Sequence, residues 1–514
     1  MKLPILEAVL DRDSIVLSSV ARKKASAKKE SLSKAHWIPA FRRDEGRSVC
    51  DSVRESELFS RLAASDAATG KAGLVQFIRF GSKQKEEHVV FSGFGDPSEL
   101  SEEKARVWGG QMLTRLMAER VNHLLLEVDA FIGDSQRMVR AWIEGLLLAN
   151  YQFSEHKSQP SARPVLQKVT VLLRDPEQVR EWKKILADLQ DEAECVHLAR
   201  DLSNQPSNIG TPEFFAAQAQ SLARKNGLRC RVLTEADARR EGMNLFLAVG
   251  AGSEREGRIV ILDYTPKTVK KPKTLVYVGK GVTFDAGGIS IKPALRMEDM
   301  KHDMSGAASI LAATLLAARR KVPVRVVAVL GFTENMPSGT AVQPGNIIRS
   351  RAGLTVEIIN TDAEGRLILA DLLDYAQQNF KPDLLLDMAT LTGAVSTALG
   401  KQCAAVFGTH VDALERTRRA ADSVGERLWQ LPLWDEYFDD LRTEHADLKN
   451  TCNDALGGTI RAALFLKQFV KKDVHWIHLD IAAMAYHLSH LSYVPKRGAT
   501  GLYVRTLAKL AQDF

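Results

Sequence analysis

The sequence predicts an α/β protein with a smaller α/β N-terminal domain, a linker helix and a larger C-terminal domain built on a mostly parallel central sheet. Three observations support this prediction. The chain has 514 residues, more than one hydrophobic core normally supports. Short apolar or alternating runs, typical of strands, recur between longer segments with helical periodicity. Near residue 203 a charged, Ala- and Leu-rich stretch gives way to a loop composition, which indicates a domain boundary.

The first predicted domain covers residues 1–174. Its β-rich runs alternate with helical patterns, the order of an α/β domain. Strands are expected at Ser14–Val20, Gly73–Phe80, His88–Phe94, His123–Val128 and Lys168–Leu173, with helices at Ser101–Arg120 and Met138–Asn150. Residues 175–202 are charged and helical in pattern and are predicted to form the linker helix.

The second predicted domain covers residues 203–514. It opens with a loop at 204–210, followed by Thr211 and Pro212, which suit the N-cap and first turn of a helix. Several later strands are nearly continuous apolar runs, which indicates a largely parallel sheet buried on both faces. Strands are expected at Thr274–Val278, Val324–Leu330, Thr355–Ile359, Leu384–Asp387 and His475–Leu479, with helices at Asp303–Arg320 and Arg366–Asn379.

Composition predicts a soluble, cytoplasmic protein. Hydrophobic residues make up 45% of the chain and charged residues 26%, as in ordinary globular proteins. The N-terminal apolar pieces are too short for a secretory signal, and no run reaches the ~18 apolar residues of a membrane span. The five cysteines lack C-x-x-C pairs, which agrees with a reducing compartment.

The net charge of +7 includes a basic run near the start of the chain. Its members are Arg22, Lys23, Lys24, Lys28, Lys29 and Lys34. Such a run is most often a solvated surface, but it would also attract the phosphates of a nucleic acid. Nucleic acid therefore stays open as a partner, with an affinity that falls steeply as salt rises.

The first segment with chemical content is residues 278–288, where a strand is expected to enter a Gly-rich loop carrying Lys280 and Asp285. Ligands of α/β sheets bind at the carboxyl ends of strands. A phosphate-binding loop was one interpretation of this glycine content. The segment lacks the spacing G-x-x-x-x-G-K-[ST] and no G-x-G-x-x-G opens a helix there, so nucleotide binding is disfavoured.

A second group of acids follows another expected strand. Asp362 and Glu364 lie two residues apart with Arg366 beside them, which alone fits either a structural ion cluster or a cation site. Together with Asp285 and Asp303, a cation site becomes the favoured interpretation, because four acids converging on apolar strand ends could not all stay ionised without cations between them. Two divalent metal ions would allow all four acids to stay ionised, and the sequence therefore predicts a two-metal site.

The ligand types limit which metals fit. Oxygen ligands without cysteine or histidine favour Mn or Mg, or Zn held mostly by oxygen. There is no H-E-x-x-H, and His487 and His490, in an expected helical stretch, are interpreted as structural. Lys280 can bind a metal only as a neutral amine, which requires its pKa to fall below the usual ~10.4.

These segments resemble the leucine aminopeptidase (leucyl aminopeptidase, cytosol aminopeptidase) family of two-metal peptidases. The resemblance covers about residues 203–514. The matching blocks are V-G-K-G-V-T-F-D at 278–285, S-I-K-P at 290–293, M-K-H-D-M at 300–304, E-N-M-P-S-G at 334–339, N-T-D-A-E-G-R-L at 360–367, A-T-L-T-G at 389–393 and H-L-D-I-A at 478–482. It implies that residues 203–514 are a catalytic metallopeptidase domain that releases N-terminal leucine or other apolar residues from peptides.

The resemblance also implies a role for each site residue. One metal would be held by Lys280, Asp285, Asp303 and Glu364, and the other by Asp285, Asp362 and Glu364, with the Asp362 carbonyl. Lys292 would donate to the oxyanion, and Arg366 would hold a bicarbonate that relays a proton. Met300, Thr390 and Gly393 would line the substrate pocket, with Leu391 presenting its backbone. The metals would be Mn or Zn, with Mg or Co possible, and the assembly a homohexamer.

One other catalytic class stays open. Two-metal sites also suit phosphoryl transfer, so the same residues could belong to a dinuclear phosphoesterase. The methionine and small residues expected in the pocket argue against an anionic substrate.

Overall fold

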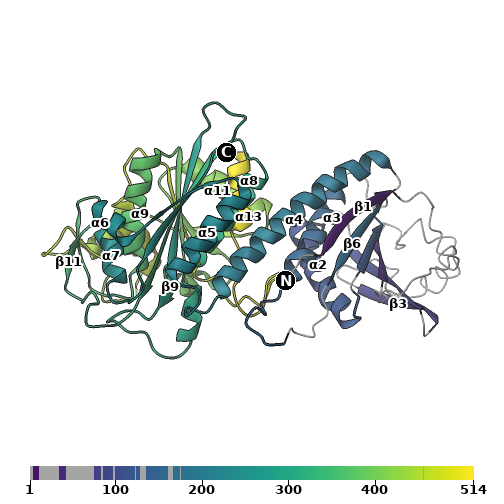
Figure 1. The fold of residues 1–514 in the computed structure, drawn as a ribbon, viewed down its shortest axis with the longest axis horizontal. Helices are drawn as coiled ribbons and strands as arrows, with labels where there is room; N and C mark the ends of the chain where they lie inside the picture. The colour runs from purple at the N-terminus through teal and green to yellow at the C-terminus, as the bar shows by residue number, and fades with distance from the viewer. Residues whose placement is uncertain are drawn as a thin grey trace. The chain divides into compact units, whose positions relative to one another are not determined.

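The computed structural model describes residues 4–10, 34–41, 75–82, 85–95, 99–121, 123–127, 135–159, 166–173, 175–454 and 456–514. The chain divides into two compact units (Figure 1). The first consists of Met1–Glu194 with Ser489–Pro495, and the second of Cys195–Leu488 with Lys496–Phe514. The expected strand at Ser14–Val20 and the basic run, apart from Lys34, lie outside the described residues.

The first unit contains a six-stranded sheet in which only the edge strand β3 is antiparallel to its neighbour. Its strands, in spatial order, are β1 (Ile5–Leu10), β6 (Lys168–Leu173), β5 (His123–Glu127), β2 (Lys34–Phe41), β4 (Lys85–Gly95) and β3 (Val75–Ser82). The sequence pattern missed β1 and β2. Glu7 interrupts the apolar run of β1, so that strand is recognisable only by its pairing with β6.

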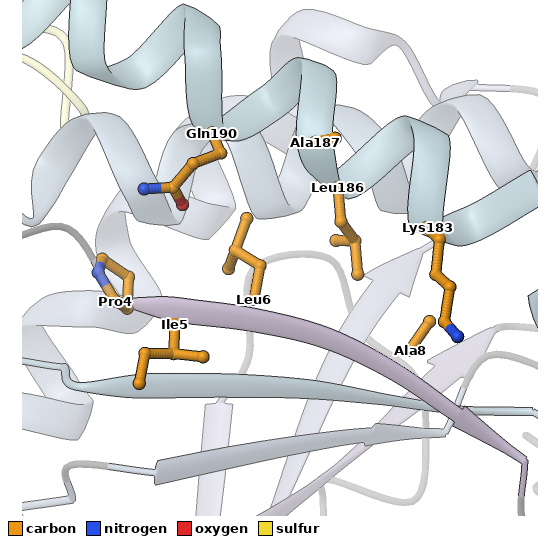
Figure 2. Close-up of a pocket in the computed structure, with 8 residues that line it drawn as sticks. All are labelled: Pro4, Ile5, Leu6, Ala8, Lys183, Leu186, Ala187 and Gln190. Carbon is orange, nitrogen blue, oxygen red and sulfur yellow. The ribbon is translucent and has the colours of Figure 1, made fainter.

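Three helices accompany this sheet: α2 (Glu102–Ala118), α3 (Ser135–Ala149) and α4 (Pro176–Asn204). The helix predicted from residue 175 is therefore present, although it ends two residues later than predicted and crosses the division between the units. An open cavity of about 380 Å³ lies between β1 and α4, where Leu6 and Leu186 project into the space between them and Ala8 lies beside Lys183 (Figure 2). None of the predicted site residues lines it.

The second unit is built on an eight-stranded mixed sheet. Its strands, in spatial order, are β15 (Leu428–Gln430), β14 (Ala404–Gly408), β17 (Trp476–Asp480), β13 (Leu384–Ala389), β9 (Thr274–Asp285), β10 (Arg325–Asn335), β8 (Arg258–Tyr264) and β7 (Arg229–Leu233). The four central strands, from β17 to β10, are mutually parallel. The predicted fold class, with a mostly parallel central sheet in the larger domain, is confirmed.

Helices cover both faces of this sheet (Figure 1). One group contains α5 (Pro212–Asn226), α8 (Ser305–Arg319), α11 (Val411–Ser423) and α13 (Val504–Asp513). The other contains α6 (Glu235–Arg240), α7 (Asn244–Gly250), α9 (Gly365–Phe380) and α12 (Gly458–Lys467). Every residue from Ser305 to Ala317 is buried, as the apolar composition of α8 predicts. Short α10 (Ala394–Leu399), η4 (Met297–His302) and η5 (Asp435–Leu441) complete the unit.

Strand β9 continues further than predicted and includes Lys280, which was expected in a loop. Its pairing with β10 runs on to Asp285. The glycines of this segment serve packing: a Cβ at Gly279 would lie 2.8 Å from Cα of Ala307 in α8. Glycine therefore lets the helix approach the strand, and no phosphate loop is formed.

Three other expectations were wrong in detail. Residues 355–359 do not join the central sheet; β12 (Thr355–Glu357) pairs instead with β11 (Ile347–Arg349) and β16 (Leu448–Lys449). The helix expected from Asp303 begins at Ser305, because the N–H of Asp303 bonds to Met300 and closes the preceding 3-10 turn. The stretch around His487 is irregular, since its φ of 55° interrupts any helix.

Candidate metal centre

The predicted metal-binding residues gather at the carboxyl ends of β9, β10 and β13, where ligands of α/β sheets bind. Strand β9 supplies Lys280 and Asp285. Asp303 lies between η4 and α8, and Glu364 immediately precedes α9. All four residues are at most 5% exposed.

Lys280 is at the middle of this cluster. Its Nζ lies 2.8 Å from both Asp303 Oδ2 and Glu364 Oε1. The same nitrogen donates a 2.8 Å hydrogen bond to the main-chain carbonyl of Thr390. The chain approaches closely here: a Cβ at Gly365 would lie 2.7–2.8 Å from the end of the lysine side chain.

Asp285 joins this cluster to Lys292 and Asp362. Lys292 Nζ lies 2.8 Å from Asp285 Oδ2 and also contacts Asp362. Asn335, at the end of β10, donates to Asp285 Oδ1 at 2.9 Å and to the Thr361 carbonyl at 3.0 Å. The two acidic segments are thus tied together by one amide.

Asp285, Asp303 and Glu364 each offer an oxygen within 4.8 Å of the others, a separation that one metal ion can span. Asp303 Oδ2 and Glu364 Oε1 are buried, and their partner among the described residues is the ammonium of Lys280, 2.8 Å from each. Buried carboxylate oxygens are costly to leave unsatisfied. The donor set therefore fits a hard divalent cation, which takes oxygen ligands.

The protein environment opposes ionisation of these acids. Burial, with repulsion from Asp285, raises the pKa of Glu364 to about 8. Burial also raises the pKa of Asp303 to about 6, and that of Asp362 above its usual range. Such clustering of raised acid pKa values is typical of functional sites.

Lys280 and Lys292 both have raised pKa values, although Lys280 would have to be a neutral amine to bind a metal ion. Burial alone lowers the pKa of Lys280, but the charges of Asp303, Glu364 and Asp285 outweigh it and raise that pKa. Asp285 and Asp362 likewise outweigh burial and raise the pKa of Lys292. With protein charges alone, both lysines are therefore ammonium groups.

Arg366 lies in the first turn of α9 and is 6% exposed. One terminal nitrogen donates a 2.7 Å hydrogen bond to the Asn450 carbonyl. Its Nε is buried and has no hydrogen-bond partner among the described residues. Burial lowers the pKa of Arg366 to about 10. This unpaired Nε–H is a donor that a small anion could use.

The residues expected to line the substrate pocket follow β13 or lie in η4. Met300 and Leu391 are half-buried and Gly393 is exposed. A Cβ at Gly393 would meet no described atom within 4 Å, so space adjoins it. The Thr390 hydroxyl donates a 2.6 Å hydrogen bond to Asp303 Oδ1, which ties this residue to the acidic cluster.

Sequence reasoning missed the residues that hold the ligands. Asn335 lies within the block E-N-M-P-S-G, and the sequence predicts no role for it. Thr361 accepts from the Ser290 N–H at 2.8 Å and donates to the Gly287 carbonyl at 2.6 Å. Asn450 donates to the Asn360 carbonyl at 2.7 Å. The position of Asn335 at a strand end was the one available signal.

Comparison with known proteins is consistent with this geometry. The catalytic domain of the cytosol aminopeptidase family matches residues 197–508, and its N-terminal domain matches residues 49–160. The chain belongs to the cytosol aminopeptidase family. The family resemblance found in the sequence is therefore confirmed, and the protein is a metal-dependent aminopeptidase, a hydrolase.

Relatives in this family cover nearly the whole chain. The chain is 40% identical to a probable cytosol aminopeptidase of Geobacter sp. (strain M21), over 93% of this chain and 96% of the relative. Identity to the probable cytosol aminopeptidase of Geobacter sulfurreducens is 39%, with coverages of 87% and 89%.

A solved structure with the same fold is the bottromycin maturation enzyme BotP in complex with Mn. It has a TM-score of 0.81 and 34% identity, covering 94% of this chain and 99% of that one. Within the described parts of the present chain, no helix has the length and apolar character needed to cross a membrane.

Proposed function

We propose that this aminopeptidase removes leucine and other apolar residues from peptide N-termini, using a water activated by two divalent metal ions. The observation that carries the proposal is the buried cluster of Asp285, Asp303 and Glu364, whose oxygens lie within 4.8 Å of one another around a single lysine. Such a cluster is unfavourable without cations. BotP, a family member of the same fold, is described with Mn.

The residues would divide between two ions. Lys280, Asp285, Asp303 and Glu364 would hold one, and Asp285, Glu364 and Asp362, with its carbonyl, the other. Mn or Zn fits this set, and Mg or Co is also compatible with it. When bound, the ions supply a water of lowered pKa and electrophilic groups for the scissile carbonyl and the peptide α-amine.

Lys280 must lose its proton to serve as a ligand. The three carboxylates that raise its pKa are the same groups that would hold the ions. Cations among them would cancel that negative charge, leaving burial to favour the neutral amine. Metal binding is therefore expected to release protons.

Lys292 and Arg366 would act on the substrate and the proton. Lys292 projects toward Asp285 and Asp362 and remains partly exposed, so its ammonium can donate to an oxyanion formed beside them. One such donor is worth about 3 kcal/mol of transition-state stabilisation. Arg366, whose Nε–H is unpaired among the described residues, would bind bicarbonate as the proton relay, through a guanidinium geometry that lysine cannot reproduce.

The proposal is tested by hydrolysis of leucine p-nitroanilide. Metal-free protein should be inactive and Mn should restore activity, whereas Glu364→Ala should stay inactive because a shared metal ligand is lost. Asp371→Asn is the matched control, since it alters a buried carboxylate that only caps α7 and contacts Arg351. Equal activity of Glu364→Ala and wild type would refute the metal centre.

Substrate choice is tested with the same protein. Leucine p-nitroanilide should be turned over faster than the glutamate and lysine analogues, because Met300 and the open space at Gly393 offer no charge partner. Turnover of p-nitrophenyl phosphate without peptide hydrolysis would instead favour the phosphoesterase alternative.

A further inference from the structure

Asp480 is a buried carboxylate at the end of β17 to which no role has been given so far. It is fully buried and pairs in register with Ala389, the last residue of β13. The Asp480 side chain contacts the loop at residues 390–393, which follows β13 directly. A buried carboxylate needs several hydrogen-bond donors. The donors to Asp480 therefore show which part of the chain this residue fixes in place.

The donors to Asp480 come mainly from this loop. Its Oδ1 accepts from the main-chain N–H groups of Leu391 at 3.2 Å and Thr392 at 3.4 Å. Its Oδ2 accepts a 2.6 Å hydrogen bond from the Thr392 hydroxyl. The N–H of Ala482 adds a fourth contact at 3.3 Å. Asp480 therefore fixes the backbone of the loop from one side.

The Thr392 hydroxyl also links the loop to two helices, α10 and α12. A hydroxyl has one hydrogen and two lone pairs. While it donates to Asp480, the Thr392 hydroxyl can accept from the Val395 N–H at 3.3 Å and from the Thr459 hydroxyl at 2.8 Å. Thr459 belongs to α12, and Val395 to α10. All the hydrogen-bonding capacity of this side chain is used to hold the loop.

The loop presents Thr390 to the metal cluster. The Thr390 carbonyl accepts from Lys280 Nζ, and its hydroxyl donates to Asp303 Oδ1. A neutral amine has one lone pair and two hydrogens. Lys280 Nζ is also 2.8 Å from Asp303 Oδ2 and Glu364 Oε1, so a neutral amine that keeps one hydrogen on the Thr390 carbonyl would direct its other hydrogen and its lone pair toward the space between these acids, where a cation would accept the lone pair. The Thr390 hydroxyl likewise occupies one oxygen of Asp303 and leaves the other for a cation.

We propose that Asp480 and Thr392 are positioning residues that hold loop 390–393, so that the two polar groups of Thr390 orient Lys280 and Asp303 for metal binding. The inference rests on the proposed metal centre and adds a residue pair that touches neither substrate nor ion. Outer-shell partners of this kind typically change metal affinity by about 10–100-fold when removed.

The test compares Thr392→Val with Thr392→Ser in the full-length protein. Valine removes the hydroxyl that bonds Asp480, whereas serine retains it. Mn²⁺ titrated calorimetrically should bind Thr392→Val about 10–100-fold more weakly in the site that includes Lys280, and Thr392→Ser close to the wild-type affinity. With Co²⁺, the visible absorption of Thr392→Val should shift, because the nitrogen ligand is misplaced.

Thr506→Val is the matched control. The Thr506 hydroxyl donates to another fully buried carboxylate, Glu426, also at 2.6 Å. Its loss should lower Tm but leave Mn²⁺ affinity unchanged. Wild-type Mn²⁺ affinity in Thr392→Val, with a fall in Tm like that of Thr506→Val, would show a merely structural role and overturn the proposal. A wild-type protein that binds no Mn²⁺ would refute the metal centre and, with it, this inference.

Discussion

Asn335 illustrates how a single side chain can organise the site. Its amide joins the end of β9, through Asp285, to the segment that carries Asp362 and Glu364, through the Thr361 carbonyl. It offers two N–H donors and fills both. A carboxylate that accepts a fixed hydrogen bond keeps its remaining lone pairs in a fixed direction, which favours a metal ion over water.

Replacing Asn335 by Leu should weaken Mn²⁺ binding by about 10–100-fold, because Asp285 and Thr361 both lose their donor. Isothermal titration calorimetry measures the change. Asn226→Leu provides the control: that amide bonds to Leu222 and Arg319, away from the proposed ligands. Unchanged Mn²⁺ affinity in Asn335→Leu would remove Asn335 from the site.

The raised pKa values of the acids predict the pH dependence of metal binding. Burial raises the pKa of Glu364 to about 8 and that of Asp303 to about 6. A carboxylic acid binds a cation only after losing its proton, so protons and Mn²⁺ compete below these values. Mn²⁺ affinity should therefore rise steeply from pH 6 to pH 8 and less steeply above, where the proton of Lys280 still has to be released. Calorimetry in buffers of different ionisation enthalpy should show proton release, and a pH-independent affinity would contradict the assignment.

At the scale of elements, the start of α9 is packed directly onto Lys280. Glu364 precedes the helix, Gly365 begins it, and Arg366 follows. The Lys280 side chain and the first turn of α9 can approach this closely because residue 365 has no Cβ. Three proposed functional side chains thus depend on one glycine.

Gly365→Ala should cost about 1–3 kcal/mol of unfolding free energy, although alanine favours the helix more than glycine does. Its Cβ would overlap the end of Lys280, so Mn²⁺ binding should fall with stability. Urea denaturation and calorimetry give the two quantities. Gly339→Ala is the control, because a Cβ there meets no described atom within 4 Å. If both variants behaved alike, the close packing would have no functional consequence.

At the scale of the whole molecule, assembly is a prediction from the family resemblance alone. A homohexamer should show a mass near six times the 56.8 kDa of one chain in light scattering. A mass near 57 kDa at micromolar concentration would refute it. Mn²⁺ should also raise Tm, since a ligand that binds only the native state stabilises it by RT ln(1 + [L]/Kd).

The reaction class, through the family resemblance, and the four central strands of the eight-stranded sheet could be predicted from the sequence. Strands β9, β10, β13 and β17 are apolar runs whose pattern is local, and α8 is apolar on every side. Lys280, Asp285, Asp303 and Glu364 could be named because a cluster of acids at strand ends has few uses other than binding cations.

The tertiary structure decided what depends on distant partners. The sequence pattern of residues 355–359 does not show which sheet they join. Their pairing with β11 and β16 places β12 in the three-stranded sheet and not in the central one. Asp303 became a turn residue because of a bond to Met300. Asn335 and Asp480 are ordinary polar residues in the sequence, and their partners lie 26 to 89 residues away. Hydrogen bonds over such separations leave no periodic pattern in a single sequence, because only the folded chain brings the donors and acceptors together.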